Sequence, residues 1–219
     1  MIKGVIFDMD GLMIDSEFLN SSSISEVIKM YGKVPIIKEN GLIHTVGLKG
    51  YDQWAEIKKT HQITESIDNL RRKRRRIYLE ILKKEKIKIM SGLKELMYIL
   101  KNKNVKLAVA SNTSKEHIVF ILKKISMFSY FHTIVSADEV KRAKPYPDIY
   151  KKVARQLGLK PSECIVLEDS QTGVLSAKRA GMFIIAVPSV FTKYQNFLKA
   201  DIILPSLRSI KWKIISSFD

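Results

Sequence analysis

The chain is poor in cysteine and in long apolar runs, and both shortages limit what it can be. It has one cysteine in 219 residues, so an internal disulfide is excluded and a reducing compartment is expected. No apolar run approaches the roughly 20 residues that a membrane-spanning helix needs, so no membrane partner is expected. The first residues (MIKG) lead directly into an apolar run without the pattern of a signal peptide. We therefore expect a cytoplasmic protein.

Acidic residues are also scarce, at 22 against 38 lysines and arginines, which gives a formal net charge of +16. Such a charge fits a nucleic-acid partner, an anionic small substrate or a proteome rich in lysine and isoleucine. Because the charge is spread over most of the chain, the last two explanations are favoured, and no nucleic-acid partner is expected. A basic nucleic-acid-binding protein without catalysis remains the alternative from a different class.

The one dense basic run spans residues 71–76 (RRKRRR). We interpret it as the solvated face of a long helix, and the alternative is that its charge attracts anionic substrates or nucleic acid. No recognised nucleic-acid motif or aromatic-interleaved basic patch accompanies the run, which favours the solvated face. Four apolar neighbours at helical spacing are expected to face inward: Leu70, Ile77, Leu79 and Leu82.

The chain begins with a short apolar strand that ends in two acidic residues. Residues 5–7 (VIF) have the continuous apolar pattern of a strand buried on both faces of a parallel sheet. Asp8 stands where this strand should end, Asp10 follows two residues later, and Gly11 allows a tight turn. Open α/β sheets bind ligands outside the carboxyl ends of their strands, so two carboxylates here mark a candidate site. A plain polar turn is the alternative, because Asp and Gly are common turn formers.

Strands and helices alternate from about residue 87 to the end of the chain. One of the expected helices, near residues 147–157, carries proline in its first turn. The alternation predicts a Rossmann-like, doubly wound α/β core, in which a parallel sheet has helices on both faces and right-handed crossovers. Six strands are expected, over residues 5–7, 105–110, 133–135, 164–167, 183–187 and 201–204.

Between residues 16 and 86 the sequence has helical patterns and no strand pattern. One short helical piece is expected near residues 40–45. We predict two domains, an α/β core of residues 1–15 and 87–219 and an inserted α-helical cap of residues 16–86. An insertion directly after the first strand lies at the mouth of the candidate site, where it can act as a lid.

Four polar clusters follow strands or precede a helix in a consistent way. Taken singly they are ordinary, since a lone lysine is usually a surface residue and a lone serine is a common strand-end residue. In a parallel sheet, however, all carboxyl ends of the strands lie on one side, so these groups can converge. The clusters are Asp8 with Asp10, Ser111 with Asn112, Lys144, and Glu168 with Asp169.

The residue types in these clusters are complementary in their chemistry. Several carboxylates in one place repel one another unless a cation lies among them. Oxygen ligands of this kind suit Mg²⁺, whereas no His or Cys spacing indicates zinc. One carboxylate beside such a cation can act as a nucleophile, and a second, two residues later, can serve as general acid and base. A hydroxyl and a lysine can neutralise the charge on a transferring phosphoryl group.

In this combination the sequence resembles the haloacid dehalogenase (HAD) superfamily, in the subgroup similar to β-phosphoglucomutase and small sugar-phosphate phosphatases. Residues 7–11 (FDMDG) match the first motif of that family, and residues 110–112 (ASN) match the second. The lysine motif is matched by residues 144–148 (KPYPD), and the acidic fourth motif by residues 168–174 (EDSQTGV). The resemblance covers the whole chain.

The resemblance implies a catalytic or metal-binding role for four acidic residues. Asp8 would attack phosphorus and become phosphorylated. Asp10 would protonate the leaving oxygen and then activate the next acceptor. Mg²⁺ would be held by the Asp8 carboxylate, the Asp10 backbone carbonyl and Asp169, with Glu168 supporting the site.

The resemblance also implies how the substrate is bound. Ser111 and Lys144 would bind the phosphoryl oxygens, with Asn112 nearby, and the helical cap would close over the substrate. The expected activity is a Mg²⁺-dependent phosphatase acting on a small phosphorylated metabolite, with a sugar phosphate favoured. The default expectation for the assembly is a monomer.

The acceptor, water or a second sugar phosphate, is decided by the cap. β-Phosphoglucomutases usually carry an arginine shortly after the cap loop and a histidine in the first cap helix, and the corresponding positions here are Gln53 and Asn20. Lys49 of the loop is retained, and His44 is a further candidate substrate contact. An arginine is a bidentate phosphate clamp, so its loss favours hydrolysis. A mutase using the same phospho-aspartate remains the alternative, and the substrate itself is not specified.

Overall fold

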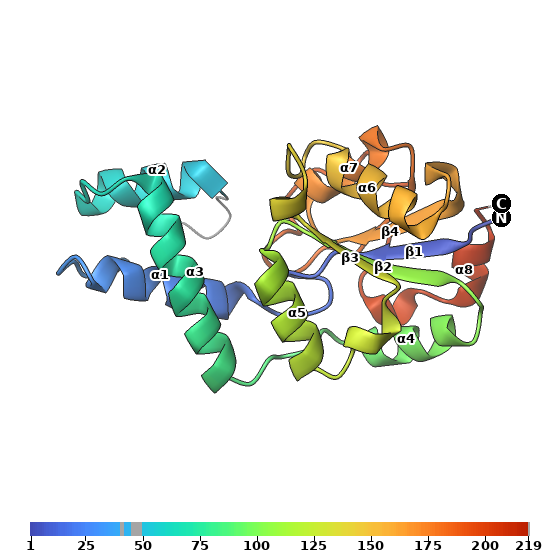
Figure 1. The fold of residues 1–219 in the computed structure, drawn as a ribbon, viewed down its shortest axis with the longest axis horizontal. Coiled ribbons are helices and arrows are strands. Elements are labelled where there is room, and N and C mark those ends of the chain that lie inside the picture. The colour runs from blue at the N-terminus through green and yellow to red at the C-terminus, as the bar shows by residue number, and fades with distance from the viewer. Residues whose placement is uncertain (40–41, 45–49, 219) are drawn as a thin grey trace. The chain divides into compact units, whose positions relative to one another are not determined.

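The computed structural model describes residues 1–39, 42–44 and 50–218 (Figure 1). The chain divides into two compact units. One unit comprises Met1–Asp15 and Lys88–Asp219, and the other comprises Ser16–Ile87. Each unit has its own arrangement of helices and its own hydrophobic core.

The unit that contains both ends of the chain is built on a six-stranded sheet with the order β3-β2-β1-β4-β5-β6. All neighbouring strands pair in parallel, which confirms the α/β fold expected from the sequence. The first strand is central, because it pairs with β2 on one side and β4 on the other. The strands are β1 (Gly4–Phe7), β2 (Lys106–Ser111), β3 (Thr133–Ser136), β4 (Cys164–Glu168), β5 (Phe183–Ala186) and β6 (Ile202–Ile203).

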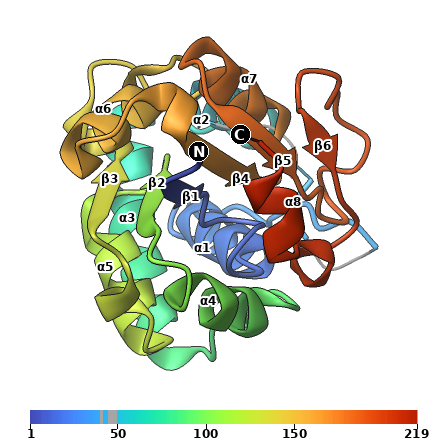
Figure 2. The same ribbon diagram turned by 90° about the vertical axis from the view of Figure 1, so that its right-hand side faces the viewer.

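Helices cover both faces of this sheet. Figure 2 shows α6 and α7 on one face and α4, α5 and α8 on the other. The helices are α4 (Leu93–Lys101), α5 (Lys115–Lys124), α6 (Asp148–Leu157), α7 (Gln171–Arg179) and α8 (Trp212–Ser216). Short 3₁₀ helices cover Phe128–Tyr130, Ala137–Glu139, Pro161–Glu163 and Leu207–Ser209.

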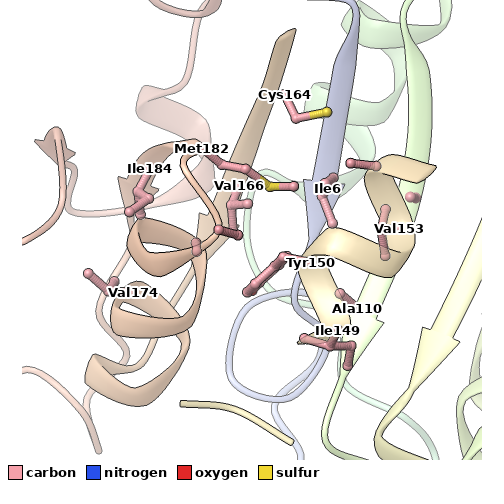
Figure 3. Packing of buried hydrophobic residues seen from close by; sticks show 14 of the residues in the cluster. Ile6, Ala110, Ile149, Tyr150, Val153, Cys164, Val166, Val174, Met182 and Ile184 are labelled. Carbon is pink, nitrogen blue, oxygen red and sulfur yellow. The ribbon is translucent and has the colours of Figure 1, made fainter. Parts of the chain in front are cut away.

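The core between the sheet and helices α6 and α7 is formed by alternate residues of the strands. Ile6 of β1 and Val166 of β4 are fully buried and pack with Tyr150 and Val153 of α6 (Figure 3). On the other side of β1, Phe7 meets the ring of Phe131 edge-on, with ring centroids 5.9 Å apart. Each such side chain contributes about 1.5–3 kcal/mol by leaving water. Strands buried on both faces explain why the sequence shows continuous apolar runs rather than alternation.

The other unit is helical, with α1 (Glu17–Lys29), α2 (Gly50–His61) and α3 (Ile67–Lys84). Its core lies between these helices, and Trp54 of α2 is buried in it. The prediction of a short helix near residues 40–45 is wrong for residues 42–44, the part of this stretch that the structure describes. Ile37 and Ile43 instead form an antiparallel bridge, as β-branched residues favour extended backbone. Residues 40, 41 and 45 lie outside the described residues.

The basic run at residues 71–76 lies on α3 and is only partly a solvated face. Leu70 and Leu82 are fully buried, as expected, and Tyr78 is an additional core residue of this helix. Arg74, however, is half-buried and turns towards α1. Its guanidinium donates to Asn20 Oδ1 and to Ser23 Oγ and stacks on the Tyr78 ring at 4.5 Å. One arginine of the run therefore ties two helices of this unit together.

Candidate active site

The site is built around Asp8, the first residue after the central strand. Its backbone N–H donates to the carbonyl of Leu167 at 3.0 Å, which continues the ladder between β1 and β4. Gly11, three residues later, has a φ of +87°, a left-handed conformation that favours glycine. A Cβ at Gly11 would overlap the Asp169 carboxylate, so this glycine lets the β1 turn approach the acidic end of β4.

Lys144 connects the acidic ends of these two strands. Its Nζ lies 2.6 Å from Asp8 Oδ1, 2.6 Å from Glu168 Oε1 and 2.8 Å from the carbonyl of Ala110. The ammonium group thus uses its three donors on three acceptors, and its side chain is almost wholly buried. A charge at this depth is stable only when it is paired and hydrogen-bonded, as it is here.

Glu168, the last residue of β4, accepts several hydrogen bonds that the sequence did not predict. Besides Lys144, the hydroxyl of Tyr150 donates to its Oε1 at 2.8 Å. Ser170 donates to Oε2 through both its backbone N–H, at 3.1 Å, and its hydroxyl, at 3.0 Å. Gly173 leaves room for this carboxylate, because a Cβ at that position would overlap it. Glu168 therefore anchors the loop of Lys144 to β4.

The charges of this cluster shift one another's pKa values. Burial raises the pKa of Asp8 from 3.8 to about 7, although the neighbouring Lys144 charge opposes this and the Glu168 charge adds to it. Burial also acts to raise the pKa of Glu168, but the charge and hydrogen bond of Lys144 outweigh it, so this pKa is lowered. For Lys144 itself, the two carboxylates outweigh burial and raise its pKa well above the usual value. A charged Lys144 with an ionised Glu168 is the consequence.

Asp10 is held separately, by two hydroxyl groups at the end of β2 and just after it. Ser111 Oγ donates to Asp10 Oδ2 at 3.2 Å, and Thr113 Oγ1 donates to the same oxygen at 2.7 Å. The other oxygen, Asp10 Oδ1, is buried and receives no hydrogen bond from any residue that the structure describes. Thr113 was missed by the sequence reasoning, because one more threonine in a serine- and asparagine-rich loop gives no signal of its own.

Asn112 holds the loop of Lys144 through that loop's backbone. Its Oδ1 accepts from the Lys144 N–H at 3.1 Å, and its Nδ2 donates to the Lys144 carbonyl at 3.4 Å. The side chain is exposed, and its predicted role beside the phosphoryl oxygens stays a prediction. The contacts that the structure shows make it a link between the end of β2 and the loop before α6.

The acidic residues of the site fit a divalent cation. One oxygen each of Asp8, Glu168 and Asp169 lies within 4.8 Å of the others, and all three residues are buried. Two of these acidic residues, Asp8 and Glu168, pair with Lys144, so the cluster holds more acidic groups than basic ones. Its donors are all oxygen, as a hard cation such as Mg²⁺ requires.

The predicted cap residues belong to the helical unit. Asn20 on α1 accepts from Arg74 and, at 3.4 Å, donates to Ser16 Oγ. The ring of His44 packs edge-on against that of His61, with centroids 5.4 Å apart. Gln53 lies on α2 and is half-buried, and Lys49 lies outside the described residues. None of these contacts tests a role in substrate binding, which stays a prediction.

Comparison with known proteins identifies the family. A family model described as haloacid dehalogenase-like hydrolase matches residues 5–187. The chain is 31% identical to Phosphorylated carbohydrates phosphatase of Thermotoga maritima, over 83% of this chain and 82% of that one. It is 30% identical to Beta-phosphoglucomutase of Bacillus subtilis, over 93% and 89% of the two chains. The crystal structure of CbbY from Rhodobacter sphaeroides in complex with phosphate is 25% identical and covers 95% of this chain and 96% of its own, with a TM-score of 0.83.

Proposed function

Because the chain belongs to the haloacid dehalogenase-like hydrolases, we propose that it is a Mg²⁺-dependent phosphatase of small phosphorylated sugars that works through an aspartyl phosphate on Asp8. The observation that carries the proposal is the buried cluster in which Lys144 bridges Asp8 and Glu168 beside Asp169. Such a cluster supplies a nucleophilic carboxylate, a fixed cation for a phosphoryl group and oxygen ligands for a metal. The related phosphatase and the related structure with bound phosphate support the same chemistry.

In the first step a carboxylate oxygen of Asp8 attacks phosphorus. The bond from phosphorus to the sugar oxygen breaks as the new bond to Asp8 forms, and a proton from Asp10 goes to the departing oxygen. Lys144 and the Ser111 hydroxyl neutralise the charge on the phosphoryl oxygens. The products of this step are the free sugar alcohol, phosphorylated Asp8 and ionised Asp10.

In the second step a water molecule replaces the sugar. Asp10 takes a proton from the water as its oxygen attacks phosphorus, and the bond from phosphorus to Asp8 breaks. Inorganic phosphate leaves, Asp8 is again a carboxylate, and Asp10 is again protonated for the next cycle. One group thus serves as acid and then as base, which suits its position two residues after the nucleophile.

The metal would be held by the carboxylates of Asp8 and Asp169 and by the backbone carbonyl of Asp10, with Glu168 supporting the site. When bound, Mg²⁺ offsets negative charge on the phosphoryl group and on Asp8. Burial raises the pKa of Asp8 to about 7 in the protein alone, and a cation held beside this carboxylate would lower that pKa and favour the ionised nucleophile.

We assign the role of a cap to the helical unit, residues 16–86. Its insertion directly after the first strand places it in the chain beside the nucleophile, where a closing unit would exclude water. Asn20, His44, Lys49 and Gln53 are its candidate substrate contacts. The core domain is assigned to residues 1–15 and 87–219.

A phosphosugar mutase is the second candidate, because one relative of similar identity is named Beta-phosphoglucomutase. A mutase uses the same phosphorylated Asp8 but must hold a second phosphate and keep water out. Asn20 and Gln53 stand where β-phosphoglucomutases usually carry histidine and arginine. Neither asparagine nor glutamine carries a positive charge that could clamp a phosphate, which favours hydrolysis.

Phosphorus NMR separates the two candidates. The protein is mixed with Mg²⁺ and β-glucose 1-phosphate, primed with a little glucose 1,6-bisphosphate, and a panel of sugar phosphates follows. Growth of inorganic phosphate supports the phosphatase, and growth of glucose 6-phosphate supports the mutase. The variant Asp8→Asn should abolish both reactions and keep the fold. Asp15→Asn is the matched control, because Asp15 pairs with the exposed Lys88 at 2.9 Å. Activity that persists in Asp8→Asn refutes the nucleophile.

A further inference from the structure

We infer that Thr113 is the positioning residue for Asp10, the general acid and base of the proposed reaction. The inference rests on the proposed function and adds to it a residue that the sequence motifs do not contain. Thr113 Oγ1 lies 2.7 Å from Asp10 Oδ2, the shorter of the two hydrogen bonds that this carboxylate accepts. In this role Thr113 sets the orientation of the Asp10 carboxylate and does not itself touch the substrate.

The register of the sheet explains why these two residues meet. Strands β1 and β2 are parallel neighbours, and Phe7 is paired with Val109. Continuing this register past the strand ends brings the turn after β1 beside the loop after β2. Asp10 and Thr113 lie on these two segments, so their contact is set by the central part of the sheet rather than by a surface loop.

The two hydroxyl groups on Asp10 have different duties. A hydroxyl has one proton, so Ser111 Oγ can donate either to Asp10 or to a phosphoryl oxygen, and not to both. Ser111 is also tied to the loop, since its Oγ accepts from the Thr113 N–H at 3.0 Å. When the Ser111 hydroxyl turns to a bound phosphoryl group, the Thr113 hydroxyl still donates its hydrogen bond to Asp10. It is then the remaining side-chain donor to this carboxylate among the described residues.

Both donors bind Oδ2, which leaves Asp10 Oδ1 to exchange the proton with the substrate. Oδ1 is buried and accepts no hydrogen bond from the part of the chain that the structure describes. Fixing one carboxylate oxygen fixes the direction of the other, and the efficiency of proton transfer depends steeply on that geometry. Loss of the Thr113 hydroxyl should therefore slow proton transfer while leaving phosphate binding in place.

The variant Thr113→Val removes the hydroxyl and keeps the shape of the side chain. The first substrate is an alkyl ester, the best sugar phosphate of the panel. We expect its kcat to fall about 10- to 100-fold, which is part of the factor of about 10²–10⁴ in rate that a general acid supplies. Its KM should change less than about twofold. The burst of p-nitrophenolate from p-nitrophenyl phosphate should change far less, because this weakly basic leaving group needs no proton. Thr113→Ser should recover most of the loss. Thr133→Val is the matched control and should leave both rates unchanged, since Thr133 lies on β3 and its Oγ1 donates to Gln156 of α6 at 2.5 Å.

A second comparison shows whether Thr113 acts through Asp10. In the Asp10→Asn background, Thr113→Val should slow the sugar-phosphate reaction no further, because the group that it positions is gone. Equal losses on both esters, no recovery in Thr113→Ser, or additive losses in the double variant would overturn the inference while the phosphatase stands. If the wild-type protein hydrolyses none of these esters, or if Asp8→Asn remains active, the proposed function fails instead. If Thr113→Val does not fold, Thr113→Ala replaces it, and a loss that is equal on the two esters would again overturn the inference.

Discussion

The hydroxyl of Tyr150 donates to Glu168 Oε1 at 2.8 Å, the same oxygen that Lys144 contacts at 2.6 Å. Tyr150 and Glu168 are both fully buried, and Lys144 Nζ also lies 5.0 Å from the centroid of the Tyr150 ring. A core residue of α6 thus contacts the buried cluster of Asp8, Lys144 and Glu168 from the side of the hydrophobic core. The packing of the hydrophobic core and the placement of Lys144 are therefore coupled.

This contact predicts the effect of Tyr150→Phe. The variant keeps the ring in the core and removes one donor from a buried carboxylate. We expect the free energy of unfolding to fall by about 1–3 kcal/mol, as measured by urea denaturation, because the Glu168 oxygen loses part of its hydrogen bonding. Tyr98→Phe is the control, since Tyr98 is 72% exposed on α4 and should cost little. Equal stability of the two variants would show that the buried bond contributes nothing measurable.

Lys144→Gln should destabilise the protein as well as inactivate it. The change leaves the buried Asp8 and Glu168 without their cation, and breaking a buried ion pair costs about 3 kcal/mol or more. The loss is limited because Asp8, whose pKa burial already raises, can take up a proton. Thermal unfolding without added metal measures the effect. Lys178→Gln breaks a half-exposed pair with Asp201, at 2.8 Å, and should cost less than about 1 kcal/mol.

Metal removal should silence the enzyme reversibly. Chelation leaves the three buried acidic residues Asp8, Glu168 and Asp169 without a divalent cation, and we expect turnover of the best sugar phosphate to fall at least about 100-fold and to return on addition of Mg²⁺. Calorimetric titration with Mg²⁺ should show one site, which Asp169→Asn removes and Asp15→Asn keeps. Turnover that is indifferent to chelation would refute the metal site.

The helical unit should lose stability in mild acid. Burial, followed by the nearby His44 and Lys33, lowers the pKa of His61 below its ordinary 6.5. The unfolded chain therefore binds a proton at a higher pH than the folded chain does. The contribution of His61 is complete above about pH 6.5 and is lost as the pH falls towards its folded pKa. Urea midpoints at pH 7.5 and 5.5 measure this, and His61→Gln should show the smaller difference. An equal difference in both proteins would assign the acid sensitivity to other groups.

Much of the fold could be predicted from the sequence because strands and helices leave local patterns of apolar and turn residues. All six strands were predicted within about two residues at each end, since buried parallel strands leave continuous apolar runs between turn residues. Asp8, Lys144 and Glu168 were found because each ends a strand or precedes a helix in an order typical of one family. What brings them within hydrogen-bonding distance is the strand order, which no local pattern contains.

The contacts that were missed are those that depend on packing between distant segments. Tyr150 appears in the sequence as one apolar residue of an amphipathic helix, and nothing local shows that its hydroxyl reaches Glu168. Thr113 meets Asp10 only through the pairing of β1 with β2. Arg74 looks like its neighbours in a basic run, and only the packing of α3 on α1 shows that it faces inward. Side-chain direction at long range is the information that the sequence pattern lacks.

The central place of β1 in the sheet also determines when Asp8 can leave its position. Its backbone is paired with β2 on one side and β4 on the other, so we expect its amide groups to exchange with solvent only when the whole sheet opens. Asp8 is attached to the end of this strand, whereas Asp10 lies in the turn beyond it. We therefore expect partial unfolding at either edge, at β3 or at β6, to leave the Asp8 carboxylate in register until the last cooperative unit of the protein unfolds.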